Sequence, residues 1–411
     1  MGQFGAFGVI SGAILILAAC QTPTPAPDPE AEHPAGQVAV LPTELLSPPS
    51  AEAALELYYR TLPEDFFPRA PRGVSLPGQG DILTRILVGS CLDEERPESR
   101  VMQTIAGEQA DLFLMIGDNV YGDMNGKGYI SNQATLDELR ESFSDLAARA
   151  DFQAVRARLP MMVAWDDHDY GANDAGREFP FRRLAERIHE RFWGLENEDV
   201  GAWPGTYYAR TFGPEGQRVQ VIMLDTRFFR SPLTPTDEWG KKGKERYVPS
   251  SSEGQDMLGN DQWTWLENQL QQPADLRLVV SSIQILPTDG HGFEAWSRLP
   301  AEQERLYGLI SETEAEGVVF VSGDRHTAFL YQSDTALPYP VSEITASSIN
   351  VSFAQTNAEI DSAQLGEGYA PDNFGAIEID WENGTVRLAI KGDTGETVNE
   401  TVVPFRTPAA N

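Results

Sequence analysis

Short runs of four or five apolar residues recur along the chain, and each ends abruptly in glycine or in polar residues. This pattern is typical of buried strands whose carboxyl ends open onto loops. Five of the runs are followed by residues whose side chains bind metal ions: Cys91, Asp118 with Tyr121, Asp166 to Asp169, Asp225, and Asp324 with His326. Because ligands bind at the carboxyl ends of strands in open α/β sheets, neighbouring strands would bring these loops into one crevice. The pattern therefore predicts a multinuclear metal site.

Helical patterns alternate with the apolar runs over most of the chain. We predict strands at 86–88, 112–116, 161–165, 278–285 and 318–321, a hairpin at 206–212 and 219–224, and helices at 44–60, 101–107, 136–148, 152–158, 180–193, 260–271 and 301–315. The last part has strands without helices between them, at 341–347, 375–381, 385–390 and 396–403, which indicates antiparallel pairing. The predicted fold class is α/β, an α+β sandwich of two packed mixed β-sheets flanked by helices.

The N-terminus resembles a bacterial lipoprotein signal peptide. A small and apolar stretch over residues 7–19 ends in Leu-Ala-Ala before Cys20, and a proline-rich segment follows. The stretch is too short for a transmembrane span, and the proline-rich segment is typical of an extended tether. We therefore expect a signal peptide at 1–19, a tether and N-terminal extension at 20–80, and one domain at 81–405.

Lipidation of Cys20 would anchor the protein to a membrane as an exported lipoprotein, at the periplasmic or outer-membrane surface or on the cell surface. The alternative is an ordinary hydrophobic N-terminal segment, because no lysine or arginine precedes the apolar stretch as in most secretory signals. With Cys20 lipidated, Cys91 has no disulfide partner. A lone cysteine is usually a small buried apolar residue, but the position of Cys91 at a strand end favours a metal ligand.

The chain carries a formal net charge of −31. Such a surface repels nucleic acid and anionic lipid headgroups, so we expect no nucleic-acid partner. Carboxylate oxygens are the ligands of Ca²⁺ and other hard cations, but many acidic proteins are simply soluble. The charge therefore argues against nucleic acid and anionic lipid headgroups as partners, but it does not indicate a particular function.

Three loop segments carry most of the candidate chemistry. In 117–121, a glycine turn aims an aspartate and a tyrosine at one point, a pair that suits Fe³⁺; the alternative is an Asx-turn. In 165–174, several carboxylates surround a histidine and repel one another unless a cation or water offsets them; the alternative is a solvated acidic loop. In 322–326, an Asp-x-His pair lies on a tight loop, and the alternative is a structural imidazole.

Taken together, these motifs resemble the PhoD-like alkaline phosphatases. The matching segments, in order, are Gly-Ser-Cys at 89–91, Gly-Asp-Asn-x-Tyr at 117–121, Trp-Asp-Asp-His-Asp-Tyr-Gly-x-Asn-Asp at 165–174, Leu-Asp-Thr-Arg at 224–227, Leu-Gly-x-x-Gln-Trp-x-Trp-Leu at 258–266 and Ser-Gly-Asp-x-His at 322–326. The resemblance covers about residues 82–375. It implies a calcineurin-like metallophosphoesterase sandwich with a ferric ion and calcium at its strand ends.

The resemblance also implies particular ligands at the matching positions. On this resemblance, Fe³⁺ would be held by Cys91, Asp118, Tyr121 and His326, and Ca²⁺ by Asp118, Asp167 and Asp324. Asp118 would then bridge the two kinds of metal ion. A thiolate bound to a metal is protected from disulfide chemistry, which suits a free cysteine in an exported protein.

The activity that the resemblance implies is hydrolysis of a small phosphoester, as in alkaline phosphatases of the D type, by a metal-activated oxygen that attacks phosphorus. His168 is our candidate for protonating the leaving oxygen. Arg227, Asn173 and Arg325 are candidates for contacting the phosphate, each with a structural alternative, and Arg227 most readily forms a salt bridge. Two other functions stay open: a phosphodiesterase with a phospholipase C-like preference, and a non-catalytic, calcium-stabilised surface lipoprotein.

Overall fold

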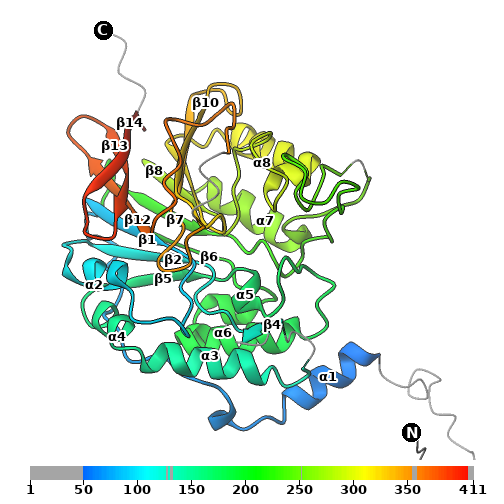
Figure 1. Ribbon diagram of the computed structural model, residues 1–411. Helices are drawn as coiled ribbons and strands as arrows, with labels where there is room; N and C mark the ends of the chain where they lie inside the picture. Colours follow the sequence, from blue (N-terminus) through cyan, green and yellow to red (C-terminus); the bar gives the residue numbers. More distant parts are fainter. Residues whose placement is uncertain (1–49, 126–127, 130–132, 251, 354–358, 406–411) are drawn as a thin grey trace, which may run out of the picture. The chain divides into compact units, whose positions relative to one another are not determined.

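Two six-stranded mixed β-sheets form the centre of the fold (Figure 1). The first sheet has the order β14-β13-β12-β1-β2-β5, with the bounds Thr397–Pro404, Thr385–Gly392, Asn373–Asp380, Arg85–Gly89, Leu112–Ile116 and Met161–Ala164. The second sheet has the order β10-β11-β9-β8-β7-β6, with the bounds Phe329–Ser333, Val341–Thr345, Val318–Ser322, Leu276–Val280, Val219–Met223 and Tyr208–Phe212. A separate ribbon pairs β3 (Met124–Asn125) with β4 (Gly128–Tyr129).

The computed structural model describes residues 50–125, 128–129, 133–250, 252–353 and 359–405. The described residues from Ala51 onward belong to one compact unit. The predicted signal peptide at 1–19, Cys20 and the proline-rich tether behind it lie outside the described residues. Within the described ranges, no helix combines the length and the apolar character that crossing a membrane requires.

The helices have recognisable start and stop residues. Their bounds are α1 Ala51–Tyr59, α2 Arg100–Gly107, α3 Asp137–Ala148, α4 Ala150–Arg156, α5 Asp167–Tyr170, α6 Arg182–Trp193, α7 Gly259–Leu270 and α8 Pro300–Glu312, with short 3₁₀ turns at Glu64–Phe66, Leu195–Asn197, Asp199–Ala202 and Trp296–Arg298. The Ser99 hydroxyl accepts the N–H of Met102 at 3.3 Å and so caps α2. Gly194 ends α6 in the left-handed conformation, and Pro300 starts α8 at its first position.

Alternate residues of the central strands enter different hydrophobic cores. In β1, Ile86 and Val88 pack in the cluster between the two sheets, whereas Leu87 packs in the cluster under the helices of the first sheet. Helices α2, α3, α4 and α6 contribute to that outer cluster, and α7 and α8 cover the outer face of the second sheet. The layers are therefore helix, sheet, sheet and helix, which confirms the predicted sandwich of two mixed β-sheets flanked by helices.

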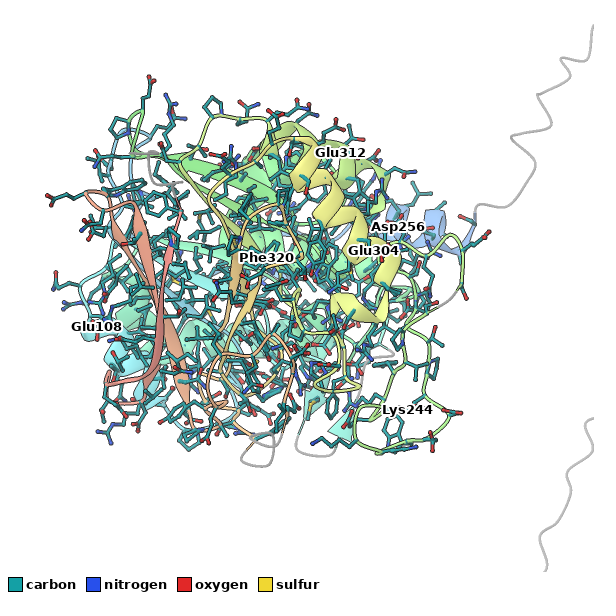
Figure 2. The ribbon with its side chains drawn as sticks, turned by 90° about the horizontal axis from the view of Figure 1, so that it is seen from above. Glu108, Lys244, Asp256, Glu304, Glu312 and Phe320 are labelled. Atoms are coloured by element: carbon teal, nitrogen blue, oxygen red, sulfur yellow. The ribbon has the colours of Figure 1, made fainter. Side chains whose placement is uncertain are left out.

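Helix α8 illustrates how a covering helix is oriented (Figure 2). Its Leu306 and Ile310 are buried in the same cluster as Phe320 of β9. Its Glu304 and Glu312 are exposed on the opposite side. The helix is therefore fixed by one apolar face against the second sheet, as its amphipathic sequence predicts.

The central strands run parallel, so their carboxyl ends lie at one edge of each sheet. In the first sheet, β1 pairs with β2, and β2 with β5, in parallel. In the second, β7, β8, β9 and β11 pair in parallel. β6 and β10 are antiparallel edge strands, and β12, β13 and β14 extend the first sheet in antiparallel pairing. The loops that leave the parallel strands build the candidate site.

Two predicted strands differ from the structure. The strand predicted at 278–285 ends at Val280, because the following residues leave the sheet and hydrogen-bond to side chains at its edge; the Ile285 N–H donates to Glu343 at 3.0 Å. For the strand predicted at 341–347, the prediction of antiparallel pairing is wrong on one side. Its observed part, β11, pairs in parallel with β9 and is antiparallel only to β10, a strand that the sequence pattern did not indicate.

The folded part of the chain begins before residue 81, where the predicted domain at 81–405 starts. Tyr59 of α1 and Phe67 are both buried in the cluster under the helices of the first sheet. The Tyr59 hydroxyl also donates to the Ala134 carbonyl at 3.3 Å. Residues 51–80, which the prediction assigns to the extension, thus contribute to the core.

Candidate metal centre

The loops after strands of both sheets converge on one buried group of metal-binding side chains. Cys91 follows β1, Asp118 follows β2 and His326 follows β9, and their ligand atoms lie within 4.8 Å of one another. Further sets within the same limit are Asp118 with Asp167 and His168, Asp166 with Asp167 and Asp324, and Asp167 with Asp174 and Glu294. The sets share Asp118 and Asp167, so they form one continuous site.

The backbone at these strand ends is strained. Positive φ angles occur at Cys91 (59°), Asp118 (49°), Asp174 (53°), Asp324 (65°) and His326 (53°). Each such residue costs about 1–3 kcal/mol and persists where its surroundings hold it, which is common at functional sites. Gly117 has a φ of 109°, and a Cβ there would lie 2.6 Å from the Cβ of Asp166. The turn after β2 therefore requires glycine.

Four side chains, Cys91, Asp118, Tyr121 and His326, form what we call the ligand cluster. The Oδ2 of Asp118 accepts the Tyr121 hydroxyl at 3.3 Å and the Cys91 thiol at 3.4 Å. The Oδ1 of the same carboxylate is buried and has no hydrogen-bond partner among the described residues. The Nδ1 of His326 hydrogen-bonds to the Val351 carbonyl, so Nδ1 carries the proton and Nε2 has the lone pair. Thiol, carboxylate, phenol and imidazole around an unpaired carboxylate oxygen fit a bound metal ion.

Burial sets the electrostatics of the ligand cluster. Burial raises the pKa of Asp118 well above its ordinary value; His168 opposes this shift and the carboxylates of Asp167 and Asp166 add to it. Burial also raises the pKa of the Cys91 thiol and of the Tyr121 phenol, and Asp118 adds to both shifts. The protein alone therefore favours the protonated forms, whereas a bound cation reverses this preference and favours carboxylate, thiolate and phenolate.

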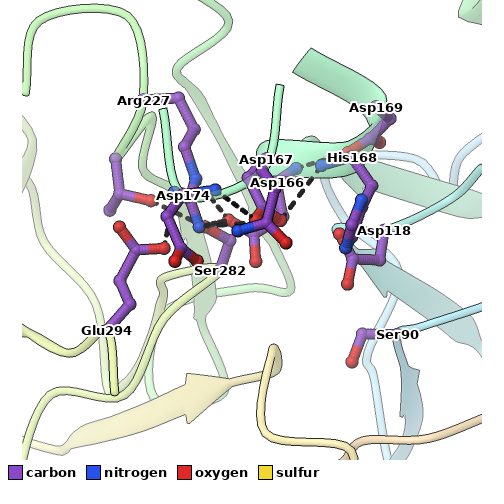
Figure 3. A network of polar contacts seen from close by, with 12 residues as sticks. Ser90, Asp118, Asp166, Asp167, His168, Asp169, Asp174, Arg227, Ser282 and Glu294 are labelled. Carbon is purple, nitrogen blue, oxygen red and sulfur yellow. Dashed lines mark hydrogen bonds and ion pairs between the residues drawn. The ribbon is translucent and has the colours of Figure 1, made fainter. Parts of the chain in front are cut away.

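A second group, Asp166, Arg227, Arg230 and Glu294, forms what we call the arginine network. Figure 3 shows Asp166, Arg227 and Glu294 of this network. The Arg227 Nε donates to Asp166 Oδ1 at 2.6 Å, its Nη1 lies 2.5 Å from Glu294 Oε2, and Arg230 Nη2 lies 2.8 Å from Glu294 Oε1. Ser282, after β8, donates to Asp166 Oδ1 at 2.6 Å. Burial opposes the charge of Arg227, but Asp166 and Glu294 raise its pKa well above the ordinary value. Arg227 therefore forms salt bridges inside the fold.

Asp225 has a structural role although it follows a strand like the other aspartates. Its Oδ1 accepts the backbone N–H groups of Arg227 at 2.8 Å and Phe228 at 2.9 Å, and its Oδ2 accepts that of Thr206 at 2.9 Å. These bonds fix the loop after β7, and Asp225 belongs to none of the metal-binding sets found among the described residues. Asp225 thus holds in place the loop that delivers Arg227.

A pocket of about 240 Å³ opens beside the ligand cluster. It is lined by Asp93, Arg96, Tyr121, Met124, Asp167, His168, Asn173, Asp174, Arg246, Phe293, Glu294, Asp324, Arg325, His326, Val351 and Phe353. Of the three candidates for contacting phosphate, Asn173 and Arg325 line this pocket and Arg227 does not. Arg325 pairs with Glu359 and its guanidinium lies 4.6 Å from the centre of the Phe293 ring.

His168 lies between the pocket and an aspartate of the loop after β2. Its Nδ1 is 2.6 Å from Asp123 Oδ1, and its ring centre is 4.2 Å from that of Tyr121. Burial opposes protonation, but Asp167, Asp118 and Asp123 together raise the pKa of His168 well above its ordinary value. With Nδ1 engaged by Asp123, Nε2 is the nitrogen left for a group in the pocket.

Residues 86–191 and 198–390 match the family described as PhoD-like phosphatase. The chain belongs to this family. It is 24% identical over 305 residues to alkaline phosphatase D of Bacillus subtilis (strain 168), an alignment that covers 67% of the chain and 48% of the relative. The chain thus spans about half the length of this curated relative.

A solved structure shares the fold of this chain. The structure, described as that of PhoD, superposes with a TM-score of 0.60 at 18% identity, covering 80% of the chain and 69% of the solved chain. At this identity the likeness supports the fold alone. The resemblance that the sequence motifs indicated is confirmed.

Several residues of the PhoD-like site were not identified from the sequence. They are Asp123 beside His168, Ser282 beside Asp166, Glu294 in the arginine network, Arg246 and Phe353 in the pocket wall, and Ser347 beside Cys91. Asp123 could have been identified from the sequence, since it lies in the same acidic loop as Tyr121. Glu294 had none, because no apolar strand precedes it and its role depends on the three-dimensional position of two arginines.

Proposed function

We propose that this protein is a metal-dependent phosphoester hydrolase. The observation that carries the proposal is Asp118, a buried carboxylate with one unpaired oxygen among a thiol, a phenol and an imidazole, next to a pocket. Fe³⁺ is proposed for the ligand cluster, because thiolate and phenolate suit a trivalent ion, and Ca²⁺ for Asp118, Asp167 and Asp324. Membership of the PhoD-like phosphatase family supports the reaction class.

We propose a different role in the reaction for each of the main residues of the pocket. Bound metal ions would lower the pKa of water and neutralise the phosphoryl oxygens. His168 is held by Asp123 with Nε2 available, so it is placed to give its proton to the leaving oxygen. Arg325 and Asn173 line the pocket and are proposed to orient the phosphate. Asp167 lies between the ligand cluster and the arginine network, and the Asp174 N–H donates to its Oδ2 at 2.6 Å, which fixes its orientation.

We propose that the protein is exported and anchored through a lipid on Cys20. The support is the sequence of residues 1–20 alone. The test compares the wild type with Cys20→Ser by membrane fractionation. The wild type should be found with the membranes and the variant in the soluble fraction; equal distribution of both would contradict the anchor.

The function is tested on purified Cys20→Ser protein by metal analysis and by rates on p-nitrophenyl phosphate and its bis ester. We expect iron and calcium in the protein, turnover of at least one ester, and loss of that turnover with EDTA and in Cys91→Ala. Turnover that survives both treatments would contradict the metal site. The ratio of the two rates separates a phosphatase from a phosphodiesterase of the phospholipase C-like kind. Bound metal without turnover on a wider panel of esters would favour the non-catalytic lipoprotein.

A further inference from the structure

Ser347 lies two residues after β11 and is buried, in contact with two members of the ligand cluster. Its Oγ is 3.0 Å from the Sγ of Cys91, and it accepts the backbone N–H of His326 at 2.8 Å. The parallel register of β11 with β9 pairs Thr345 with Ser322, which brings the residues after both strands side by side. One hydroxyl thus contacts a side chain from the first sheet and a backbone group from the second.

The direction of both hydrogen bonds follows from the number of protons. A serine hydroxyl has one proton and two lone pairs. The N–H of His326 can only donate, so Ser347 Oγ accepts there and its own proton is available to Cys91. Ser347 can therefore act as a hydrogen-bond donor to a sulfur anion, without giving up its bond to His326.

Ser90 provides an internal comparison. Its Oγ also lies near the sulfur, at 3.5 Å from Cys91 Sγ, but it donates its proton to the Ala346 carbonyl at 3.0 Å. Both serines are buried, and both lie within contact distance of the same sulfur. Of these two hydroxyls, only that of Ser347 is oriented to donate to a thiolate.

We propose that Ser347 is a positioning residue that donates a hydrogen bond to the Cys91 thiolate and so tunes its bond to iron. The proposal rests on the iron site of the proposed function. A hydrogen bond to a ligating sulfur withdraws electron density from it, and such bonds tune metal–thiolate sites. Through its second bond, Ser347 also holds His326 in its strained backbone conformation, φ 53°. The same hydroxyl would thus adjust one ligand and orient another.

The test compares Ser347→Ala with Ser90→Ala after both are loaded with iron. Iron content, the visible charge-transfer spectrum and competition with a chelator are measured, and Cys91→Ala shows which absorption comes from sulfur. Without its donor the thiolate is more electron-rich, so the sulfur band of Ser347→Ala should move to longer wavelength. Iron binding should weaken about 10-fold or more, as is usual when a partner of a metal ligand is removed. Ser90→Ala should keep the wild-type band and affinity, and Ser347→Thr should restore both.

A second measurement needs no variant and applies even if Ser347→Ala does not fold. Metal-free wild-type protein is loaded with iron in H₂O or D₂O, and the iron–sulfur stretching frequency is compared by resonance Raman spectroscopy. A frequency shift is expected if a hydroxyl proton is bonded to the sulfur. No shift, or an iron-loaded Ser347→Ala protein with an unchanged sulfur band, would overturn the role of Ser347 alone. Wild-type protein that binds no iron would overturn the proposed function and this inference with it.

Discussion

Two buried acidic regions lie side by side in the crevice and balance their charge in different ways. In the arginine network, Asp166 and Glu294 contact guanidinium groups of Arg227 and Arg230. In the ligand cluster, Asp118 contacts a thiol and a phenol, which are neutral when protonated. Among the described residues, one oxygen of Asp166 also has no hydrogen-bond partner, but its other oxygen is paired with the Arg227 guanidinium. The chain supplies the positive charge of the arginine network with two guanidinium groups, whereas beside Asp118 only His168 offsets part of the negative charge, and an ion would supply the rest.

Asp167 connects the two regions. Its Oδ1 lies 4.0 Å from Arg227 Nη2, and its carboxylate belongs to the same metal-binding sets as Asp118 and Asp324. Burial opposes ionisation, but His168 and Arg227 hold the pKa of Asp167 below its ordinary value. A carboxylate that is already ionised is ready to bind a cation without losing a proton first. His168 and, to a smaller extent, Arg227 of the arginine network therefore keep one ligand ionised for the ion that would bind at the ligand cluster.

The largest expected effect comes from removing the carboxylate charge of Asp118, the central residue of the ligand cluster. Asp118→Asn should lower kcat/KM on the active p-nitrophenyl ester on the order of 10³-fold, because a shared metal ligand is lost. Iron and calcium content should fall in the same protein. Activity and metal content are measured on the Cys20→Ser background.

Asp225→Asn is the matched control for that substitution. Asp225 also follows a buried strand, but its carboxylate accepts three backbone N–H groups and belongs to none of the metal-binding sets found among the described residues. We expect it to retain bound metal and to lose stability by about 1–3 kcal/mol, the cost of unsatisfied buried donors. Equal loss of metal in both variants would mean that the two aspartates do not differ in role.

The second expected effect is on stability and arises in the arginine network. Arg227→Met would leave Asp166 and Glu294 buried without their shared cation, at a cost of about 3–5 kcal/mol in the free energy of unfolding. The loss is measured by urea unfolding in the presence of a chelator, so that metal binding does not contribute.

Arg387→Met provides the comparison at the surface. Arg387 makes two ion pairs as well, with Glu378 at 2.9 Å and Glu400 at 2.6 Å, but its side chain is 30% exposed. Such a pair is worth about 1 kcal/mol or less. A similar loss in both variants would show that burial of the network adds nothing to its stability.

The convergence of strand ends could be predicted from the sequence, because it depends on local pattern. Buried runs such as 112–116 end at the residue where the polar loop begins, and parallel strands place such loops at one edge. The interpretation of Arg227 as a salt-bridge residue rested on the same reasoning, and the structure shows its salt bridges with Asp166 and Glu294.

The features that escaped prediction depend on pairing between distant segments. Nothing in the sequence of residues 341–347 shows that this strand lies parallel to β9. The proximity of Ser347 to Cys91 could therefore not be predicted from the sequence. The position of Glu294 between two arginines has the same cause. Tyr59 and Phe67 belong to the core although their surroundings are rich in proline and charge, because helices far along the chain cover them.

The smallest expected effect is on the stability of the metal-free protein. Here Asp118→Asn should increase the free energy of unfolding, although the same substitution should impair metal binding and activity. Burial raises the pKa of Asp118 in the fold, so its protonated form stabilises the protein. That contribution is fully present below the unfolded pKa of about 3.9 and is lost as the pH rises through the folded pKa. The side chain introduced by Asp118→Asn is an amide, which stays neutral at every pH.

With a chelator present, Asp118→Asn should therefore be more stable than the wild type at pH 8, and the difference should shrink as the pH is lowered toward 4. Added metal should reverse the order, since binding at 100 times Kd stabilises the wild type by about 2.7 kcal/mol and the variant lacks the shared ligand. Thermal and urea unfolding at several pH values measure both differences. A chelated wild type that is the more stable protein at pH 8 would show that the chain itself balances the charge of Asp118, as it does that of Asp166, and the distinction between the two regions would fail.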